Sequence, residues 1–359
     1  MIPPDASATD QGGPVRPGES FDVAAVSEWL RAFLPDLAGQ PEVTQYPGGA
    51  SNWTYRLRYA NHDLILRRPP AGTRAKSAHD MGREFRVQQA LKPVFPWVPD
   101  MVALCQDESL LGVEFYVMAR IPGLIPRARL PAGLRLDAEQ ARQLCLNWVD
   151  KLADLHAVDT QTPGLAALGK GTGYCQRQIA GWSDRYEKAR TWNVPSYAGV
   201  RAWLKAHTPD DVATCVIHGD WRLDNVVLDP ADPTRIIGVL DWEMATLGDP
   251  LMDLGNAMAY WVQADDGFLM RTTRRQPSHL PGMLTRQEVL ARYLAKTGRT
   301  AENWAFYEVY GLFRLAVIAQ QIYYRYHHKQ TRNPAFRNFW ILIHYLHWRC
   351  RSVIAKGHS

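Results

Sequence analysis

The sequence has few cysteines, and none is arranged for a disulfide framework or a zinc site. Its five cysteines, Cys105, Cys145, Cys175, Cys215 and Cys350, are scattered singly, with no Cys-x-x-Cys pair and no Cys/His cluster at zinc spacing. A chain of 359 residues can bury a large apolar core without such cross-links. The odd number and the dispersion of the cysteines favour reduced thiols and a cytoplasmic location.

Long hydrophobic runs are also absent. The strongest candidate for a membrane span, residues 311–324, is interrupted by Arg314, Gln320 and Gln321, so the sequence predicts no such span. The N-terminal segment lacks the apolar region of a secretory signal and is rich in Pro, Gly and small polar residues. That composition predicts a disordered leader over residues 1–20.

Acidic residues are scarce in the last third of the chain. From Leu254 onwards, fifteen Lys and Arg stand against five Asp and Glu, a net charge of +10, whereas the preceding residues carry −5. Such asymmetry favours a small anionic partner for the C-terminal part. Basic residues spread over solvated helices would give the same count. No nucleic-acid-binding motif accompanies them, so we expect neither nucleic acid nor membrane as a partner.

The spacing of apolar residues divides the chain into two parts. Residues 22–35 and 77–92 have helical spacing, the second with Ser77 as N-cap, and the segments around them alternate as strands do. Further on the spacing is mainly helical, apart from two short strands predicted at 225–229 and 236–241. We therefore predict an α+β fold with two lobes.

The predicted lobes meet near Pro122-Gly123. The small N-terminal lobe, over residues 21–122, is expected to hold an antiparallel sheet. The larger helical lobe is expected over residues 123–359.

The residues best suited to chemistry lie in the segment 216–255. It contains His218-Gly219-Asp220, then Asn225, and then Asp241 after a predicted hairpin. Transfer of a phosphoryl group to a hydroxyl requires a carboxylate that accepts the hydroxyl proton and cations that neutralise the phosphate. A second carboxylate and an amide oxygen suit Mg²⁺, which prefers hard oxygen ligands. Arg222 can place a cation against the transferring phosphate.

This segment resembles the catalytic and metal-binding loops of the aminoglycoside phosphotransferase family, which has a two-lobed, protein-kinase-like fold. The resemblance implies that ATP is the phosphate donor and Asp220 the catalytic base. It also implies that Asn225 and Asp241 bind Mg²⁺, and that Asp253 braces the catalytic loop through hydrogen bonds to its backbone. His156 occupies the position that the family uses for packing a helix against a loop, so the resemblance implies a structural role for it.

The small lobe contains a plausible clamp for ATP. A turn rich in small residues carries Gly49, Ser51 and Asn52, whose backbone N–H groups can approach phosphates. Arg67, or its neighbour Arg68, stands where a kinase has the lysine of its third strand. Arginine keeps the positive charge but contacts phosphate with a different geometry.

Two further features complete the expected nucleotide site. Glu84, on the following helix, is the expected ion-pair partner of the arginine, although it also fits a solvated helix charge. The segment 115–120 resembles the last strand of a kinase small lobe, so adenine should contact backbone groups from Met118 to Arg120. For the side chain of Met118, core packing is an equal alternative.

Stretches outside the catalytic segment resemble one branch of the family. GGASNWTYRL, LDWEMATLGDPLMDL and FRLAVIAQQIYYR resemble the kinase-like domains associated with acyl-CoA dehydrogenases. This implies a hydroxyacyl-CoA thioester as acceptor. An aminoglycoside or amino alcohol as acceptor, and an ATP-binding pseudokinase, are the alternatives. The aromatic run 323–329 can stack an adenine or pack a helix face.

Overall fold

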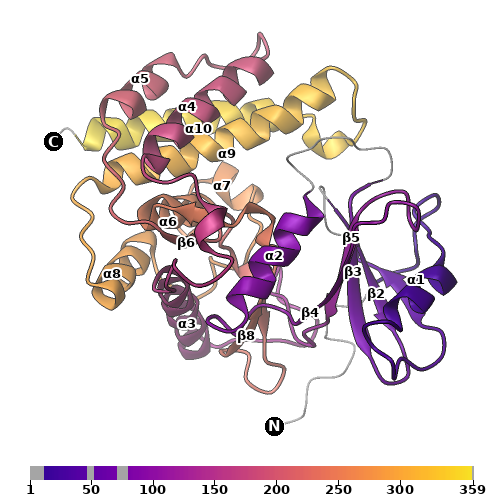
Figure 1. Ribbon diagram of the computed structural model, residues 1–359. Coiled ribbons are helices and arrows are strands. Elements are labelled where there is room, and N and C mark those ends of the chain that lie inside the picture. The colour runs from indigo at the N-terminus through magenta and orange to yellow at the C-terminus, as the bar shows by residue number, and fades with distance from the viewer. Residues whose placement is uncertain (1–11, 47–51, 71–79, 358–359) are drawn as a thin grey trace.

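The computed structural model describes residues 12–46, 52–70 and 80–357, which form two lobes (Figure 1). The smaller lobe is built on a five-stranded antiparallel sheet with strand order β1-β2-β3-β5-β4. The larger lobe is mainly helical. The predicted α+β architecture is therefore confirmed. The strands of the small lobe are β1 (Glu42–Gln45), β2 (Trp53–Arg58), β3 (Asp63–Arg68), β4 (Met101–Cys105) and β5 (Phe115–Ala119).

Two helices flank this sheet. Helix α1 (Val23–Leu30) ends earlier than the predicted segment 22–35. Helix α2 (Met81–Leu91) begins after Asp80, whose carboxylate accepts a hydrogen bond from the backbone N–H of Arg83 at 2.7 Å. Asp80 is thus the N-cap. The predicted cap, Ser77, lies outside the described residues.

The prediction of a disordered leader is wrong for residues 12–20, which pack on the sheet. Gly13 and Gln45 exchange two backbone hydrogen bonds of 2.8 Å. The carbonyl oxygen of Glu19 accepts hydrogen bonds from Tyr55 Oη at 2.6 Å and from Arg68 Nη2 at 2.7 Å. The polar and glycine-rich composition that indicates disorder is offset here by partners on the sheet.

The chain crosses between the lobes through a tight contact at Gly123. Its neighbour Leu124 pairs with Leu228 of the large lobe by backbone hydrogen bonds of 2.8 and 3.0 Å. A Cβ atom on Gly123 would lie 2.4 Å from Val227 Cγ1 and 2.5 Å from the carbonyl oxygen of Leu228. Only glycine fits this approach, which explains a glycine at the predicted lobe boundary.

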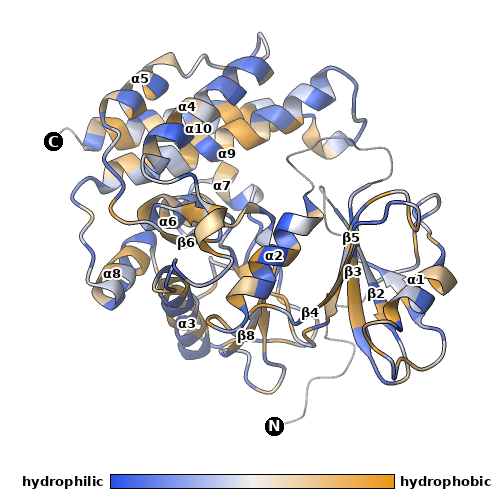
Figure 2. Ribbon diagram, viewed as in Figure 1, coloured by the Kyte–Doolittle hydropathy of each residue, from blue (hydrophilic) through white to orange (hydrophobic). Residues whose placement is uncertain are grey.

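The large lobe carries most of the helices, and Figure 2 shows that these tend to be hydrophobic on one side and hydrophilic on the other. Its longer helices are α3 (Ala138–His156), α4 (Tyr174–Ala189), α5 (Ala198–Ala206), α6 (Pro250–Ala259), α8 (Arg286–Thr297), α9 (Trp304–His327) and α10 (Phe339–Lys356). Shorter elements are β6 (Cys215–Ile217), β7 (Val226–Leu228), β8 (Ile236–Val239), β9 (Thr246–Gly248), α7 (Phe268–Thr272) and the 3₁₀ turns η2 (Ala166–Leu168), η3 (Leu223–Asn225), η4 (Trp242–Met244) and η5 (Pro334–Phe336). The predicted hairpin is present as β7 and β8, whereas the β6–β9 pair was not predicted.

Helix α9 runs through the core of the large lobe and packs tightly on α6 and α10. Where α6 and α9 meet, a Cβ atom on Gly311 would lie 2.1 Å from the carbonyl oxygen of Gly255. A Cβ atom on Gly255 would in turn lie 2.5 Å from the carbonyl oxygen of Tyr307. The two glycines therefore allow the helix backbones to touch.

Replacing Gly311 by Ala should destabilise the protein by about 3 kcal/mol, because the added methyl group forces the helices apart. Gly181, in α4, is the matched control, since a Cβ atom there meets nothing within 4 Å. Gly181→Ala should leave stability unchanged or raise it by up to about 1 kcal/mol through helix propensity. Denaturant unfolding measures both, and equal effects of the two substitutions would contradict the close packing.

Two expectations from composition can be compared with the structure. All five cysteines are buried and unpaired. In the described part of the chain, no helix is both long and apolar enough to cross a membrane.

Candidate active site

The predicted catalytic loop follows β6, and its backbone is hydrogen-bonded to Asp253 on α6. This fully buried carboxylate accepts hydrogen bonds from the backbone N–H groups of His218 and Gly219, both at 2.9 Å. His156 Nε2 lies 3.2 Å from the same carboxylate, and its Nδ1 lies 2.7 Å from Tyr293 Oη. The structural roles predicted for Asp253 and His156 are therefore confirmed. Hydrogen bonds and the His156 ring lower the pKa of Asp253 in spite of its burial.

The His218 side chain ties the catalytic loop to the strand that leads to Asp241. Its Nε2–H donates to the carbonyl oxygen of Leu240 at 3.0 Å, and its Nδ1 accepts from the backbone N–H of Asp220 at 3.3 Å. These two partners require one neutral tautomer of the ring. The loop is thereby held at a fixed position relative to the neighbouring metal-binding candidate.

Asp220 and Asn225 lie side by side, as the sequence spacing predicts. Asn225 Nδ2 donates to the carbonyl oxygen of Asp220 at 2.9 Å and to its Oδ2 at 3.2 Å. With the amide nitrogen used in this way, the amide oxygen of Asn225 is the atom left for a metal ion. The predicted roles of both residues are compatible with this arrangement.

Arg222 belongs to the same loop but is held by carboxylates. Its Nη2 lies 3.3 Å from Asp220 Oδ2 and its Nε lies 3.1 Å from Asp224 Oδ1, while its guanidinium stacks over the Tyr260 ring. Burial raises the pKa of Asp224, a residue that was not among the predicted site residues. Arg222 thus adds positive charge beside Asp220, and its predicted contact with the phosphate stays a prediction.

Asp241 projects from a strained turn after β8. Its backbone has φ +67°, in the left-handed region that non-glycine residues seldom adopt. Strain of this kind tends to occur where function fixes the direction of a side chain. Asp241 Oδ1 lies 3.2 Å from Arg67 Nη2, so the turn presents this carboxylate to the small lobe.

The two arginines of β3 point to opposite faces of the sheet, because successive strand residues alternate. Arg67 faces α2 and the large lobe, where its Nη1 lies 3.1 Å from Glu84 Oε1. Arg68 faces α1 and donates to the carbonyl oxygens of Glu19 and Ser20. The geometry therefore selects Arg67 as the residue in the predicted phosphate-binding position, and the expected ion pair with Glu84 forms.

Glu243 is a site residue that the sequence reasoning missed. Its Oε2 accepts from Asn52 Nδ2 at 3.2 Å and lies 3.7 Å from Arg67 Nη2, so it contacts the small lobe at two points. Burial, together with the nearby carboxylates of Asp241, Glu84 and Asp220, raises the pKa of Glu243 to about 7. In the sequence, the only indication that Glu243 belongs to the site was its position two residues after Asp241.

Three carboxylates thus surround one guanidinium, and this excess of negative charge fits a divalent cation. The group consists of Glu84, Asp241 and Glu243 around Arg67, and the charge of Asp220 reaches Glu243. Asp241 and the amide oxygen of Asn225 are hard oxygen groups of the kind that Mg²⁺ takes as ligands. Arg83 also joins α2 to this region, since its guanidinium donates to the backbone carbonyl oxygens of Glu243 and Ala245.

At the predicted adenine-binding edge, two backbone N–H groups already have partners within the small lobe. The backbone N–H of Arg120 donates to the carbonyl oxygen of Asp63 at 2.9 Å, and that of Ala119 donates to Asp100 at 2.8 Å. The Arg120 guanidinium contacts Asp63 Oδ2 at 3.0 Å. These N–H groups are therefore used within the lobe, and a base at this edge has to use carbonyl groups or a donor farther along the chain.

Two of the other residues predicted for the nucleotide site, Met118 and Asn52, lie in the described part of the small lobe. The side chain of Met118 packs in an apolar cluster with Ile65, Phe85 and Tyr116, which is the core-packing alternative. Asn52 is buried and contacts Glu243. Gly49 and Ser51 lie outside the described residues.

Comparisons with known proteins agree with this site. The model of a family described as "Phosphotransferase enzyme family" matches residues 42–300. Acyl-CoA dehydrogenase family member 10 of Mus musculus is 35% identical over 315 residues, which cover 87% of this chain and 29% of that protein. Acyl-CoA dehydrogenase family member 11 of Homo sapiens is 34% identical over 332 residues, covering 90% of this chain and 42% of that protein. The chain therefore spans less than half the length of these relatives.

Solved structures give the same fold. A protein from Ralstonia eutropha, provisionally described as an aminoglycoside phosphotransferase, is 30% identical, with a TM-score of 0.79 and coverage of 94% of this chain and 99% of that one. Choline kinase from Cryptosporidium parvum has a TM-score of 0.62 at 12% identity, with coverage of 94% and 97%. At that identity the likeness concerns the fold alone.

Proposed function

Because the chain belongs to the phosphotransferase enzyme family, we propose that it transfers the γ-phosphate of ATP, in the presence of Mg²⁺, to a hydroxyl group of a hydroxyacyl-CoA thioester. The observation that carries the proposal is the convergence of Asp220, Asn225 and Asp241 beside Arg67. A pseudokinase would be expected to lack at least one of these groups, and all three are present.

The chain's own residues can perform the steps that phosphoryl transfer requires. Asp220, on a loop fixed by Asp253 and His218, accepts the proton of the attacking hydroxyl and orients its oxygen. Arg67 offers a cation to the phosphates of the nucleotide. Mg²⁺, held by Asn225 and Asp241, would neutralise charge on the transferring phosphate.

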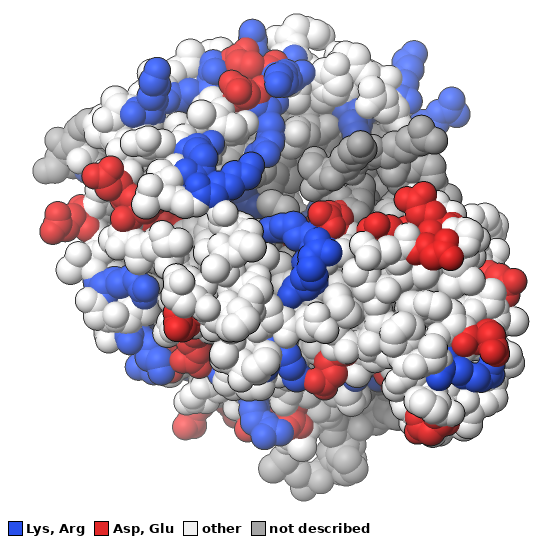
Figure 3. Space-filling model, viewed as in Figure 1, with Lys and Arg blue, Asp and Glu red and all other residues white. Residues whose placement is uncertain are grey.

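The charge of the C-terminal part supports an anionic acceptor. After Glu308 the chain contains eight Lys and Arg and neither Asp nor Glu. On the face seen in Figure 3, Asp and Glu gather on the small lobe, while the upper part of the large lobe, where α4 and α5 lie, carries many Lys and Arg and some Asp and Glu. Aminoglycosides are polycations and would be repelled by such a surface, whereas CoA carries phosphates that it would attract. The names of the relatives, acyl-CoA dehydrogenase family members, also support a CoA thioester.

The nucleotide part of the proposal predicts a thermal shift. Millimolar Mg·ATP should raise the melting temperature, because a ligand of the native state shifts unfolding by mass action. Asp241→Asn should remove most of this shift, since it removes a charge from the metal site. The matched control is Asp265→Asn, at an exposed carboxylate that accepts a hydrogen bond from Gln263 Nε2, and this variant should keep the shift. No shift in the unsubstituted protein would contradict the proposal.

The acceptor is tested by a side-by-side assay of ATP consumption. The panel contains 3-, 4- and 5-hydroxyacyl-CoA, the matching free acids, an aminoglycoside series and choline. We expect turnover of a thioester and at least tenfold lower kcat/KM for the free acid, because binding of the remote CoA part helps to position the hydroxyl. Turnover of an aminoglycoside or choline, with no turnover of any thioester, would show that the acceptor assignment is wrong. The proposal of phosphotransferase activity would still hold.

A further inference from the structure

One side of α9 is partly exposed from Leu315 to the end of the helix. It begins next to Arg314, a buried arginine whose Nη2 donates to the carbonyl oxygen of Gly219 at 2.8 Å, next to Asp220. From Leu315 to Ile322, the residues that keep solvent exposure are three or four positions apart and so share one helix face, which Arg325 continues. We call this surface the α9 face. Its residues are Leu315, Ile318, Gln321, Ile322 and Arg325. Tyr324, Tyr326 and His327 also keep exposure, on other sides of the helix end.

The α9 face changes in character along its length. Near the catalytic loop it is apolar, and at its far end it is cationic, with exposed Arg325 followed by exposed Lys329 and Arg332. Within the part of the chain that the structure describes, none of these three cations forms an ion pair. Their charge is therefore available to a ligand, and the absence of Asp and Glu after Glu308 leaves no acidic residue nearby in sequence.

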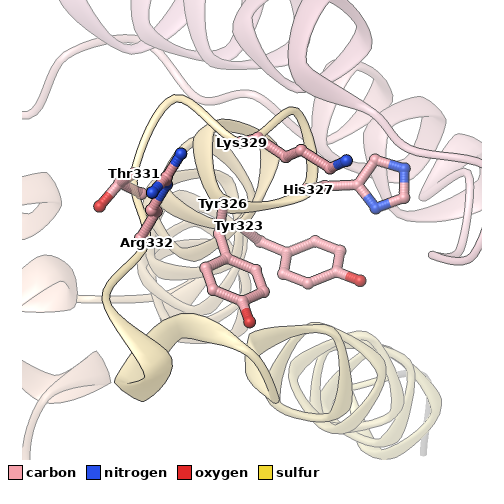
Figure 4. Close-up of a pocket in the computed structure, with 6 residues that line it drawn as sticks. All are labelled: Tyr323, Tyr326, His327, Lys329, Thr331 and Arg332. Carbon is pink, nitrogen blue, oxygen red and sulfur yellow. The ribbon is translucent and has the colours of Figure 1, made fainter.

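A hollow lies at the C-terminal end of α9, beside the turn into η5. The hollow has a volume of about 420 Å³ and is lined by Tyr323, Tyr326, His327, Lys329, Thr331 and Arg332. Tyr326, four residues after Ile322, adjoins the α9 face, whereas Tyr323 and His327 are each two residues from Arg325 and lie on the other side of the helix. Figure 4 shows Lys329 and Arg332 on opposite sides, with the rings of Tyr323 and Tyr326 between them. Aromatic rings flanked by cations suit a purine base that carries phosphate groups.

The length of the α9 face can be compared with that of a CoA thioester. Eleven residues separate Arg314 from Arg325, which corresponds to about 16 Å along the helix axis. The pantetheine arm of CoA has the reach of four to five extended residues, roughly 15 Å. A thioester whose hydroxyl lies at Asp220 can therefore place its phosphates at Arg325.

We propose that the α9 face binds the CoA part of the acceptor. The apolar residues Leu315, Ile318 and Ile322 contact the pantetheine arm. Arg325, Lys329 and Arg332 bind the phosphates, and the adenine lies in the tyrosine-lined hollow. This assignment rests on the proposed function, because it takes the acceptor to be a CoA thioester.

The test compares two substrates that differ only in the nucleotide end. These are a hydroxyacyl-CoA and the same acyl group on N-acetylcysteamine, which lacks the phosphates and the adenine. The double substitution Arg325→Ala/Lys329→Ala should raise KM for the CoA thioester about 5- to 20-fold with little change in kcat, the effect of removing two exposed charge pairs. KM for the N-acetylcysteamine thioester should be unchanged. Arg325→Lys should restore part of the affinity.

Arg351→Ala is the matched control. It removes an exposed arginine from α10 close to Cys350, whose thiol contacts the carbonyl oxygen of Val309 at the opposite end of α9. It should leave both KM values unchanged. If the double substitution left KM for the CoA thioester unchanged, or affected both thioesters equally, the assignment would be overturned while the phosphotransferase function stood.

A binding measurement covers the case in which no thioester is turned over. Adenosine 3′,5′-bisphosphate is the probe, and its affinity is measured by calorimetry at low and moderate salt. Binding to the unsubstituted protein that weakens with salt and is lost in the double variant would support the cationic hollow even if the proposed acceptor is wrong. No binding of this probe, together with no effect of the substitutions, would overturn the inference.

Discussion

Asp220→Asn should lower kcat by about 10²- to 10⁴-fold, the range associated with loss of a positioned general base. The asparagine side chain keeps the shape and can still contact Asn225, but it cannot accept the hydroxyl proton. Affinity for Mg·ATP should stay within a few-fold, because Asp220 is assigned to the acceptor rather than to the nucleotide. Steady-state kinetics and calorimetric titration with Mg·ATP measure the two quantities.

The control for this substitution is Asp232→Asn, an exposed carboxylate in the turn between β7 and β8. It should leave both quantities unchanged. If Asp220→Asn instead abolished nucleotide binding and left kcat within tenfold, the roles assigned to Asp220 and Asp241 would have to be exchanged.

The largest effect on stability is expected at Asp253. Asp253→Ala should lower the free energy of unfolding by about 3–5 kcal/mol, since it leaves the backbone N–H groups of His218 and Gly219 buried without an acceptor. Activity should fall as well, because the catalytic loop loses its support. Denaturant unfolding followed by circular dichroism measures the change.

Asp265→Ala, on the surface of the same lobe, should change stability by less than about 0.5 kcal/mol. A loss below about 1 kcal/mol for Asp253→Ala would mean that other groups support the loop. If the substituted protein does not fold, Asp253→Asn keeps one acceptor oxygen and should give a smaller loss on the same scale.

The catalytic half of the site was predictable from sequence because its residues are close together in the chain. Asp220, Asn225, Asp241 and Asp253 lie within one segment, whose polar residues stand out from apolar strands and turns. The choice between Arg67 and Arg68 stayed open in the sequence. Strand alternation places Arg67 on the face of Ile65 and Arg68 on that of Leu66, and both faces are apolar. Only the structure shows that the face of Ile65 carries the α2 cluster.

Contacts between distant parts of the chain could not be predicted in this way. Asn52 and Glu243 are 191 residues apart, and only the folded arrangement brings them together. The same limit explains the error over residues 12–20. Their composition indicates disorder, but Tyr55 and Arg68 provide hydrogen bonds that no local pattern reveals.

Helix α2 belongs to the cores of both lobes, and this has a consequence for motion. Met81 and Phe85 pack on the small-lobe sheet, whereas Val87 and Leu91 lie in the large-lobe core, and Arg83 bonds to the loop after Asp241. Any movement of the sheet relative to the large lobe must therefore separate α2 from one of its two sets of partners. If α2 keeps its contacts with the large lobe, Glu84 separates from Arg67 on β3, and the 3.1 Å pair between them lengthens. The distance between these two side chains then reports how far the lobes have moved apart.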